Sequence, residues 1–511
     1  MLPLFATLLL LLAAPVRDTG VNAEPGAVAA AAVVAPAPAQ VSNAGAALTT
    51  APAAAPAHVT DVTDVVAGYA DEVAAIMAES LARGRAMERL TALCSTAPRR
   101  LAGSPGYLAA AEWARQTMLA DGLENVRWEL VEVPHWVRGS TGRVRLVEPA
   151  AHAAELPMLA LGGSIATPPG GITAELVVVD SLDAGKLLGE AARGRIVLFN
   201  GPLDPTLPTT FAAYSGAVGQ RGAGATVAAR QGAVASLVRS MTTRLDDNPH
   251  TGAMHYADDV PRIPHAAIST LAAEKLATLV AAGQRVVLHI EQNCETLPNE
   301  QNPNVIGEYR GTTRADEVLV VGGHLDAWDV GQGAHDDGGG CVQALEALRL
   351  LKTLGLRPKR TIRVVMFANE ENGLAGGRGY AKAHEGELPR HVLALESDSG
   401  SFVPRGFSSD ATGDTRELLA AIVELLEPWG AGTLVQGGGG ADIGPMRAHG
   451  VIQVGLKPDS ARYFDLHHSP RDTIEQVNPR ELALGAGAMA ALLYVAADIE
   501  PGFTREAAES R

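Results

Sequence analysis

Histidine and carboxylate side chains gather in five short polar stretches in the C-terminal half of the chain, at residues 322–326, 333–340, 368–373, 396–400 and 467–473. Three of them directly follow short aliphatic runs, at 318–321, 362–367 and 392–395, which are typical of buried strands. Open α/β sheets bind ligands beyond the carboxyl ends of their strands. The spacing therefore predicts that the polar stretches meet in one site.

The residue types in these stretches favour a metal site. Unpaired carboxylates in a low-dielectric environment cost several kcal/mol each, and a bound cation removes that cost. Imidazole and carboxylate ligands without thiolate suit Zn²⁺, with Mn²⁺ or Co²⁺ as chemically possible substitutes. Two ions about 3.5–4 Å apart that share one carboxylate would form a two-metal hydrolase site. One carboxylate must then stay unligated as general base, and the Glu370–Glu371 pair suits one base and one ligand.

In this order the motifs resemble those of the co-catalytic dizinc exopeptidases of the aminopeptidase Y and plasma glutamate carboxypeptidase group, and within it the carboxypeptidase Q branch. The matching stretches are GHLDAWDVGQG (323–333), DDGGG (336–340), EE (370–371), ESD (396–398) and HHS (467–469). RLAGSPG (100–106) and PHTG (249–252) extend the similarity over most of the chain.

The resemblance implies two Zn²⁺ ions per chain, bridged by Asp336. Its ligand sets are His324, Asp336 and Asp398 for one ion, and Asp336, Glu371 and His468 for the other. Glu370 is implied as the general base. Asp326 and Asp472 are implied as carboxylates that orient His324 and His468.

Two further features of the site follow from the same resemblance. Relatives place a strained peptide between the aspartates that match Asp336 and Asp337. In some relatives a tyrosine precedes the last metal-binding histidine and stabilises the oxyanion, whereas this chain has His467. We expect the His467 imidazole N–H to take that role, since an oxyanion needs only a well-placed donor.

The elements that position these residues predict an α/β fold. Short apolar strands, including 452–454, alternate with helical stretches at 342–352 and 415–426, which favours a mixed, mostly parallel sheet sandwiched by helices. Upstream, the pattern predicts amphipathic helices over 61–88 and from Ser104 to Met118, then a strand at 126–133. The middle of the chain has short strands at 176–179, 196–199 and 285–290, followed by a polar, proline-containing connector over 293–304.

These observations divide the chain into four parts. We expect a signal peptide at 1–23, an Ala/Pro-rich flexible linker at 24–58, and a catalytic zinc peptidase domain formed by 59–136 and 293–500. The intervening 137–292 resembles an inserted, β-rich protease-associated domain. The apolar run of the signal is too short to span a bilayer, and the mature protein is expected to be secreted or periplasmic with no membrane span.

Composition limits the possible partners and disulfides of the protein. With 41 basic and 57 acidic side chains among 511 residues, the net charge is −16, which argues against nucleic acid as a partner. Three cysteines allow at most one disulfide, for which Cys94 and Cys294 are candidates, while Cys341 begins an apolar helix and is expected to be buried.

Other polar residues are expected to be structural. His250, His265, His335 and His449 occupy no ligand position of the motif. Asp442, beyond the Gly437–Gly440 run, either contacts substrate or caps a helix. The three glycines 338–340, between a ligand and a helix, are expected to permit close packing.

The sequence therefore predicts an exported dizinc exopeptidase that hydrolyses dipeptides or short peptides with free termini. The metal motif is shared by aminopeptidases, carboxypeptidases and dipeptidases, and the resemblance favours a carboxypeptidase Q-like dipeptidase and a homodimer. Two other classes remain open: a non-peptidase zinc amidohydrolase or cyclase, and an inactive binding homologue that would hold no zinc.

Overall fold

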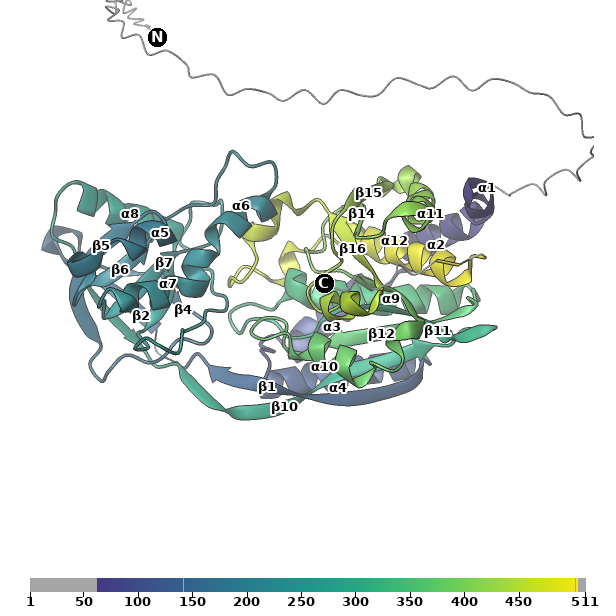
Figure 1. Ribbon diagram of the computed structural model, residues 1–511, viewed down its shortest axis with the longest axis horizontal. Coiled ribbons are helices and arrows are strands. Elements are labelled where there is room, and N and C mark those ends of the chain that lie inside the picture. The colour runs from purple at the N-terminus through teal and green to yellow at the C-terminus, as the bar shows by residue number, and fades with distance from the viewer. Residues whose placement is uncertain (1–61, 141, 501, 504–511) are drawn as a thin grey trace, which may run out of the picture. The chain divides into compact units, whose positions relative to one another are not determined.

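The computed structural model describes residues 62–140, 142–500 and 502–503 (Figure 1). The predicted signal peptide and linker lie outside these residues.

An eight-stranded mixed sheet carries the polar stretches identified above. Its order is β1 (Glu124–Val137), β10 (Glu295–Tyr309), β12 (Arg360–Phe367), β11 (Arg314–His324), β13 (His391–Glu396), β16 (Ile452–Pro458), β14 (Pro404–Ser409) and β15 (Thr433–Gln436). The central strands β12, β11, β13 and β16 run parallel to one another, and β14 is parallel to β15. The remaining neighbours are antiparallel, so the prediction of a mixed, mostly parallel sheet is confirmed.

Both faces of the central strands are buried, which explains their nearly continuous aliphatic sequences. In β11, Leu319 and Val321 join the main core cluster, whereas Val318 and Val320 point into a second cluster that includes Tyr380. The main core is built with residues of α4 (Pro105–Ala120), α9 (Gly339–Thr353), α11 (Gly413–Glu424) and α12 (Pro479–Asp498). The second cluster packs against α10 (Ala375–Ala383).

Helix α12 is long and apolar enough to cross a membrane by length and composition alone. However, 83% of its apolar window is buried inside the protein, where it packs against α9 and α2 (Ala70–Arg83). Its hydrophobicity is therefore that of a core helix.

The sequence predicts one amphipathic helix over 61–88, but the structure divides this segment among three helices. It forms α1 (Val62–Ala67), α2 and the start of α3 (Ala86–Thr96). Gly84 ends α2 in an extended conformation, and a Cβ at this position would lie 2.2 Å from the Ser80 carbonyl oxygen. The next predicted helix is confirmed: Ser104 caps α4 by accepting a hydrogen bond from the Tyr107 N–H, and Pro105 follows at its first turn.

The prediction of a connector over 293–304 is wrong, because most of this segment belongs to β10. Residues 295–304 pair with β1 on one side only, and the ladder with β12 begins at Val305. A strand with one open edge tolerates prolines and polar side chains, which is why the sequence resembled a loop.

The middle of the chain forms a second eight-stranded mixed sheet. We call this sheet and its helices, residues 142–292, the second lobe. Its order is β3 (Ala154–Leu156), β2 (Gly142–Glu148), β9 (Val287–Gln292), β5 (Ile172–Val179), β6 (Ile196–Phe199), β7 (Ala235–Arg239), β8 (His265–Ile268) and β4 (Met158–Ala160). Four helices accompany it: α5 (Leu182–Lys186), α6 (Thr210–Ala217), α7 (Gly219–Arg230) and α8 (Thr270–Ala281).

Short helical turns complete the described residues. They are η1 (Ala150–His152), η2 (Gly189–Ala192), η3 (Ala334–Gly338), η4 (Leu388–Arg390), η5 (Glu427–Trp429), η6 (Gly444–His449), η7 (Ser460–Asp465) and η8 (Ile474–Gln476).

Candidate functional site

The five polar stretches meet at the carboxyl-terminal edge of the central sheet. His324 is the last residue of β11, Glu370 and Glu371 follow β12, and Asp398 follows β13. Asp336 lies in η3, directly before α9, and the Asp336–Asp337 peptide bond is cis. Since β11, β12 and β13 are parallel neighbours, their carboxyl ends converge and bring these side chains together.

Asp336 lies between two groups of potential metal ligands. On one side, the Nε2 of His324 lies 3.3 Å from Asp336 Oδ1 and 3.6 Å from Asp398 Oδ1. The ligand atoms of these three residues all lie within 4.8 Å of one another. These three residues are the first ligand set that the family resemblance implies.

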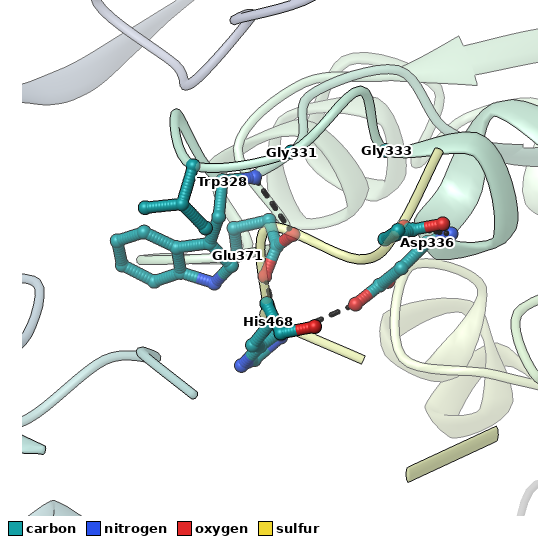
Figure 2. A pocket seen from close by; sticks show the side chains of 9 residues that line it. Trp328, Gly331, Gly333, Asp336, Glu371 and His468 are labelled. Atoms are coloured by element: carbon teal, nitrogen blue, oxygen red, sulfur yellow. Dashed lines mark hydrogen bonds and ion pairs between the residues drawn. The ribbon is translucent and has the colours of Figure 1, made fainter. Parts of the chain in front are cut away.

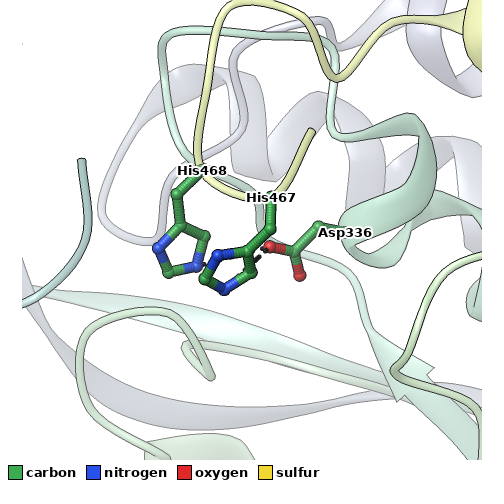
Figure 3. A group of neighbouring side chains, drawn as sticks. All are labelled: Asp336, His467 and His468. Carbon is green, nitrogen blue, oxygen red and sulfur yellow. Dashed lines mark ion pairs between the residues drawn. The ribbon is translucent and has the colours of Figure 1, made fainter. Parts of the chain in front are cut away.

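The second group lies at the other oxygen of Asp336. The Nε2 of His468 lies 3.3 Å from Asp336 Oδ2 and 2.9 Å from Glu371 Oε2 (Figure 2). His467 stacks on His468 with ring centroids 3.5 Å apart, and its Nε2 lies 3.8 Å from Asp336 Oδ2 (Figure 3). Asp336, His467 and His468 also form a group compact enough to hold an ion, so the second side offers His467 in addition to the predicted Glu371.

The donor set fits divalent cations. Among the described residues, His324 Nε2, Asp336 Oδ2 and Glu371 Oε2 are buried and have no hydrogen-bond partner. A buried polar atom without a partner is costly, and a cation between these atoms would satisfy all of them. Burial also lowers the pKa of His468 well below its usual value, which keeps the imidazole neutral, as metal coordination requires.

Asp326 supports the site in a different way from the prediction. The Nδ1 of His324 lies 3.1 Å from the backbone carbonyl oxygen of Asp326 and 3.9 Å from its nearest carboxylate oxygen. The carboxylate instead accepts hydrogen bonds from the backbone N–H groups of Glu370 (3.0 Å) and Glu371 (3.3 Å). Asp326 therefore fixes the turn that carries the proposed base and ligand.

The prediction that Asp472 orients His468 is corrected by the structure. Both carboxylate oxygens of Asp472 accept backbone N–H groups, from His335 (2.7 Å) and from Asp336 (3.1 Å). The reason is the sharp turn at η3, whose N–H groups have no helical partner and need a buried acceptor. Asp472 thus holds the backbone of the central carboxylate.

Burial is the dominant influence on the proposed base. It raises the pKa of Glu370 to about 8, aided by the neighbouring carboxylates of Asp398, Asp326 and Asp336 and opposed by His324. A dication held by Asp336 and Asp398 would oppose this shift, because it stabilises the ionised form.

Contacts from the second lobe reach the His467–His468 pair. The Nδ1 of His250 lies 2.7 Å from the His467 carbonyl oxygen, and the Thr251 N–H donates to the His468 carbonyl at 2.9 Å. Arg221 Nη1 lies 3.4 Å from His468 Nδ1. From the sequence, His250 was expected to be structural, although it lies in the 249–252 stretch that carries part of the resemblance.

Other sequence expectations have clear outcomes. Asp442 caps no helix with its side chain: η6 follows Ile443 without a side-chain cap, and neither Asp442 carboxylate oxygen has a hydrogen-bond partner among the described residues. Cys94, Cys294 and Cys341 are all buried, free thiols, so the candidate disulfide is not formed. His335 and His265 contact Ser401 and Ser236.

Comparison with known proteins connects this geometry to a family. The model of "Peptidase family M28" matches residues 304–493. Carboxypeptidase Q of Mus musculus is 38% identical over 443 residues, which cover 86% of this chain and 92% of that protein. Carboxypeptidase Q of Homo sapiens is 39% identical over 419 residues, with 82% and 86% covered.

Solved structures agree with these matches. The Peptidase M28 precursor of Shewanella amazonensis has a TM-score of 0.82 and 33% identity, with 87% of this chain and 99% of that chain covered. A zinc aminopeptidase from Bacillus subtilis has a TM-score of 0.61 at 20% identity, covering 83% of this chain and 98% of that chain, and this likeness shows the fold alone.

The buried carboxylates predict a pH dependence of stability that metal reverses. Burial raises the pKa of Glu370 to about 8 and that of Asp472 to about 7. Between about pH 7.5 and pH 8.5 the folded, metal-free protein therefore holds more protons than the unfolded chain, and its free energy of unfolding should fall as pH rises. The buried histidines with lowered pKa values oppose this trend near pH 6.5, where they are about half protonated in the unfolded chain, but they are mostly neutral in both states above about pH 7.5.

The measurement is the urea midpoint at about pH 7.5 and about pH 8.5, in chelator and in Zn²⁺. We expect the midpoint to fall with pH in chelator and to rise on zinc addition most strongly at the higher pH. A midpoint in chelator that stays constant or rises over this range would contradict the prediction.

Proposed function

The chain belongs to peptidase family M28, with carboxypeptidase Q among its relatives, and on that premise we propose that this metallopeptidase is an exported two-zinc exopeptidase. Its proposed substrates are dipeptides or short peptides with free termini. The observation that carries the proposal is the position of Asp336, whose two oxygens face two separate groups of potential ligands.

The proposed ligands divide around Asp336. His324 and Asp398 would hold one Zn²⁺ with Asp336, and Glu371 and His468 would hold the other with the same carboxylate. When bound, the two ions would polarise the scissile carbonyl and lower the pKa of the attacking water.

Protein side chains would move the proton. Glu370 would take it from the attacking water and deliver it to the leaving amine, while the Asp326 carboxylate fixes the Glu370 backbone. Burial lowers the pKa of His467 well below its usual value, so its neutral ring could donate a single N–H to the developing oxyanion.

The remaining parts of the proposal concern the rest of the chain. Residues 1–23 would direct export to a secreted or periplasmic location, 24–58 would act as a tether, and the mature protein would form a homodimer. Residues 59–136 with 293–500 would be the catalytic domain. The insert 137–292 would be a protease-associated domain that narrows the cleft and favours short substrates, a role supported by its contacts with the His467–His468 pair.

Capping the substrate termini tests which end is read. We expect zinc-loaded enzyme to hydrolyse a free dipeptide and to fail on both its N-acetylated and its C-amidated forms, because a dipeptidase needs both charged ends. Turnover of the three forms is measured by release of the free amino acid. Cleavage of the amide would indicate an aminopeptidase, and cleavage of the acetylated form a carboxypeptidase.

Replacing the proposed base separates catalysis from metal binding. Glu370→Gln keeps the size of the side chain but cannot accept the proton, so we expect kcat to fall by roughly 10²- to 10⁴-fold with zinc content unchanged. The matched control is Glu385→Gln, at an exposed glutamate, which should behave as wild type. A Glu370→Gln enzyme with wild-type kcat would exclude this role.

His467 distinguishes an oxyanion donor from a ligand. For His467→Ala we expect a large loss of kcat, a small change of KM and two retained zinc ions per chain. Kinetics are measured together with zinc content by mass spectrometry. Loss of one zinc ion would instead make His467 a ligand, as its distance to Asp336 also allows.

A further inference from the structure

The histidine pair proposed to bind metal lies in a loop whose backbone is held partly by its own hydrogen bonds and partly by residues from another part of the chain. His468 has a left-handed backbone with φ 61°, which is uncommon for a residue with a side chain. Such a conformation persists only where the surroundings fix it. Within the loop, the His467 N–H donates to the Tyr463 carbonyl, whereas the carbonyl groups of His467 and His468 accept hydrogen bonds from outside the loop.

Those partners come from the second lobe, more than 200 residues away in sequence. His250 Nδ1 lies 2.7 Å from the His467 carbonyl oxygen, 217 positions away, and because a carbonyl can only accept, Nδ1 must carry the proton. The Thr251 N–H donates to the His468 carbonyl at 2.9 Å. Each carbonyl of the pair is thus held by one residue of the other lobe.

The two holding residues are themselves fixed and buried. His250 is 2% exposed and Thr251 is fully buried. The backbone N–H of His250 donates to Ser240 Oγ at 2.8 Å, and the Thr251 hydroxyl donates to the Ala160 carbonyl at 2.9 Å. Ser240 follows β7 and Ala160 ends β4, so the contacts transmit the position of the second sheet to the loop.

We propose that His250 and Thr251 are positioning residues that hold His467 and His468 at Asp336, so that the metal site on this side of Asp336 forms only when the second lobe is in place. The inference rests on the proposed two-metal centre. In the part of the chain that the structure describes, neither His250 nor Thr251 hydrogen-bonds to His324 or Asp398, so the site formed by those two residues should form without them. Supporting residues of this kind typically change metal affinity by roughly 10- to 100-fold.

The test compares zinc affinities of variants at position 250. His250→Ala removes the donor. His250→Asn places an amide nitrogen as many bonds from the backbone as Nδ1, whereas His250→Gln carries the same amide one methylene too far. His265→Ala is the control for a structural role, because His265 is also fully buried in the second lobe but bonds to Ser236 instead of the loop.

Zinc bound per folded chain and its two dissociation constants are measured by chelator competition and mass spectrometry, without an activity assay. We expect wild type and His265→Ala to bind two ions alike. In His250→Ala and His250→Gln one ion should bind roughly 10- to 100-fold more weakly, with near-complete rescue in His250→Asn. If His250→Ala does not fold, the Asn and Gln pair decides the question.

Two results would overturn the inference: unchanged constants in His250→Ala and His250→Gln, or equal weakening of both sites in all variants including His265→Ala. Wild-type protein that binds no zinc would contradict the two-metal centre itself, so failure of the proposed function is distinguishable from failure of this inference.

Discussion

The burial of Asp336 and the residues around it is the constraint on which the rest of the structure depends. His324, Asp326 and Glu371 are each at most 5% exposed. Among the described residues, three atoms of the proposed ligands have no hydrogen-bond partner. Burying such groups is favourable only if something else compensates their charge and lone pairs. The backbone supplies part of this compensation through N–H groups that point at Asp326 and Asp472. The remaining, unsatisfied atoms face inward, where cations would complete the site.

Close backbone approach is the second requirement, because the carboxylates must converge from different strands. A Cβ on Gly323 would lie 2.2 Å from Asp337 Oδ2, and one on Gly340 would lie 1.9 Å from the Ser397 carbonyl oxygen. The expectation that glycines 338–340 permit close packing is therefore confirmed. Arg100 holds the connecting loop by donating to the carbonyls of Leu325 (2.6 Å) and Gly333 (2.7 Å), where Gly333 adopts a left-handed φ of 60°.

The sequence predicts those features of the site that arise from local pattern. Aliphatic runs ending in polar residues locate β11, β12 and β13 and the proposed ligands at their carboxyl ends, because strand burial and strand ends are both visible in residue type. Long-range contacts, in contrast, are not visible in residue type. Residues 293–304 resemble a loop because their edge is open, and only pairing with β1 makes them a strand. The acceptor role of Asp472 and the reach of His250 likewise depend on segments that fold back from elsewhere, which no local spacing encodes.

Paired strands join the second lobe to the central sheet, and this explains how residues of the second lobe reach the candidate site. The antiparallel pairing of β1 with β10 continues to Val137 and Glu295, at the point where the chain enters and leaves the second lobe. The next strands, β2 and β9, pair with each other from Gly142 and Gln292 onward. Entry and exit are thus held side by side through both sheets, which restricts the rotation that a single flexible linker would allow. An insert attached in this way can place His250 within hydrogen-bonding distance of the His467 carbonyl, because its position is set by the same strand, β10, that pairs with β12 in the central sheet.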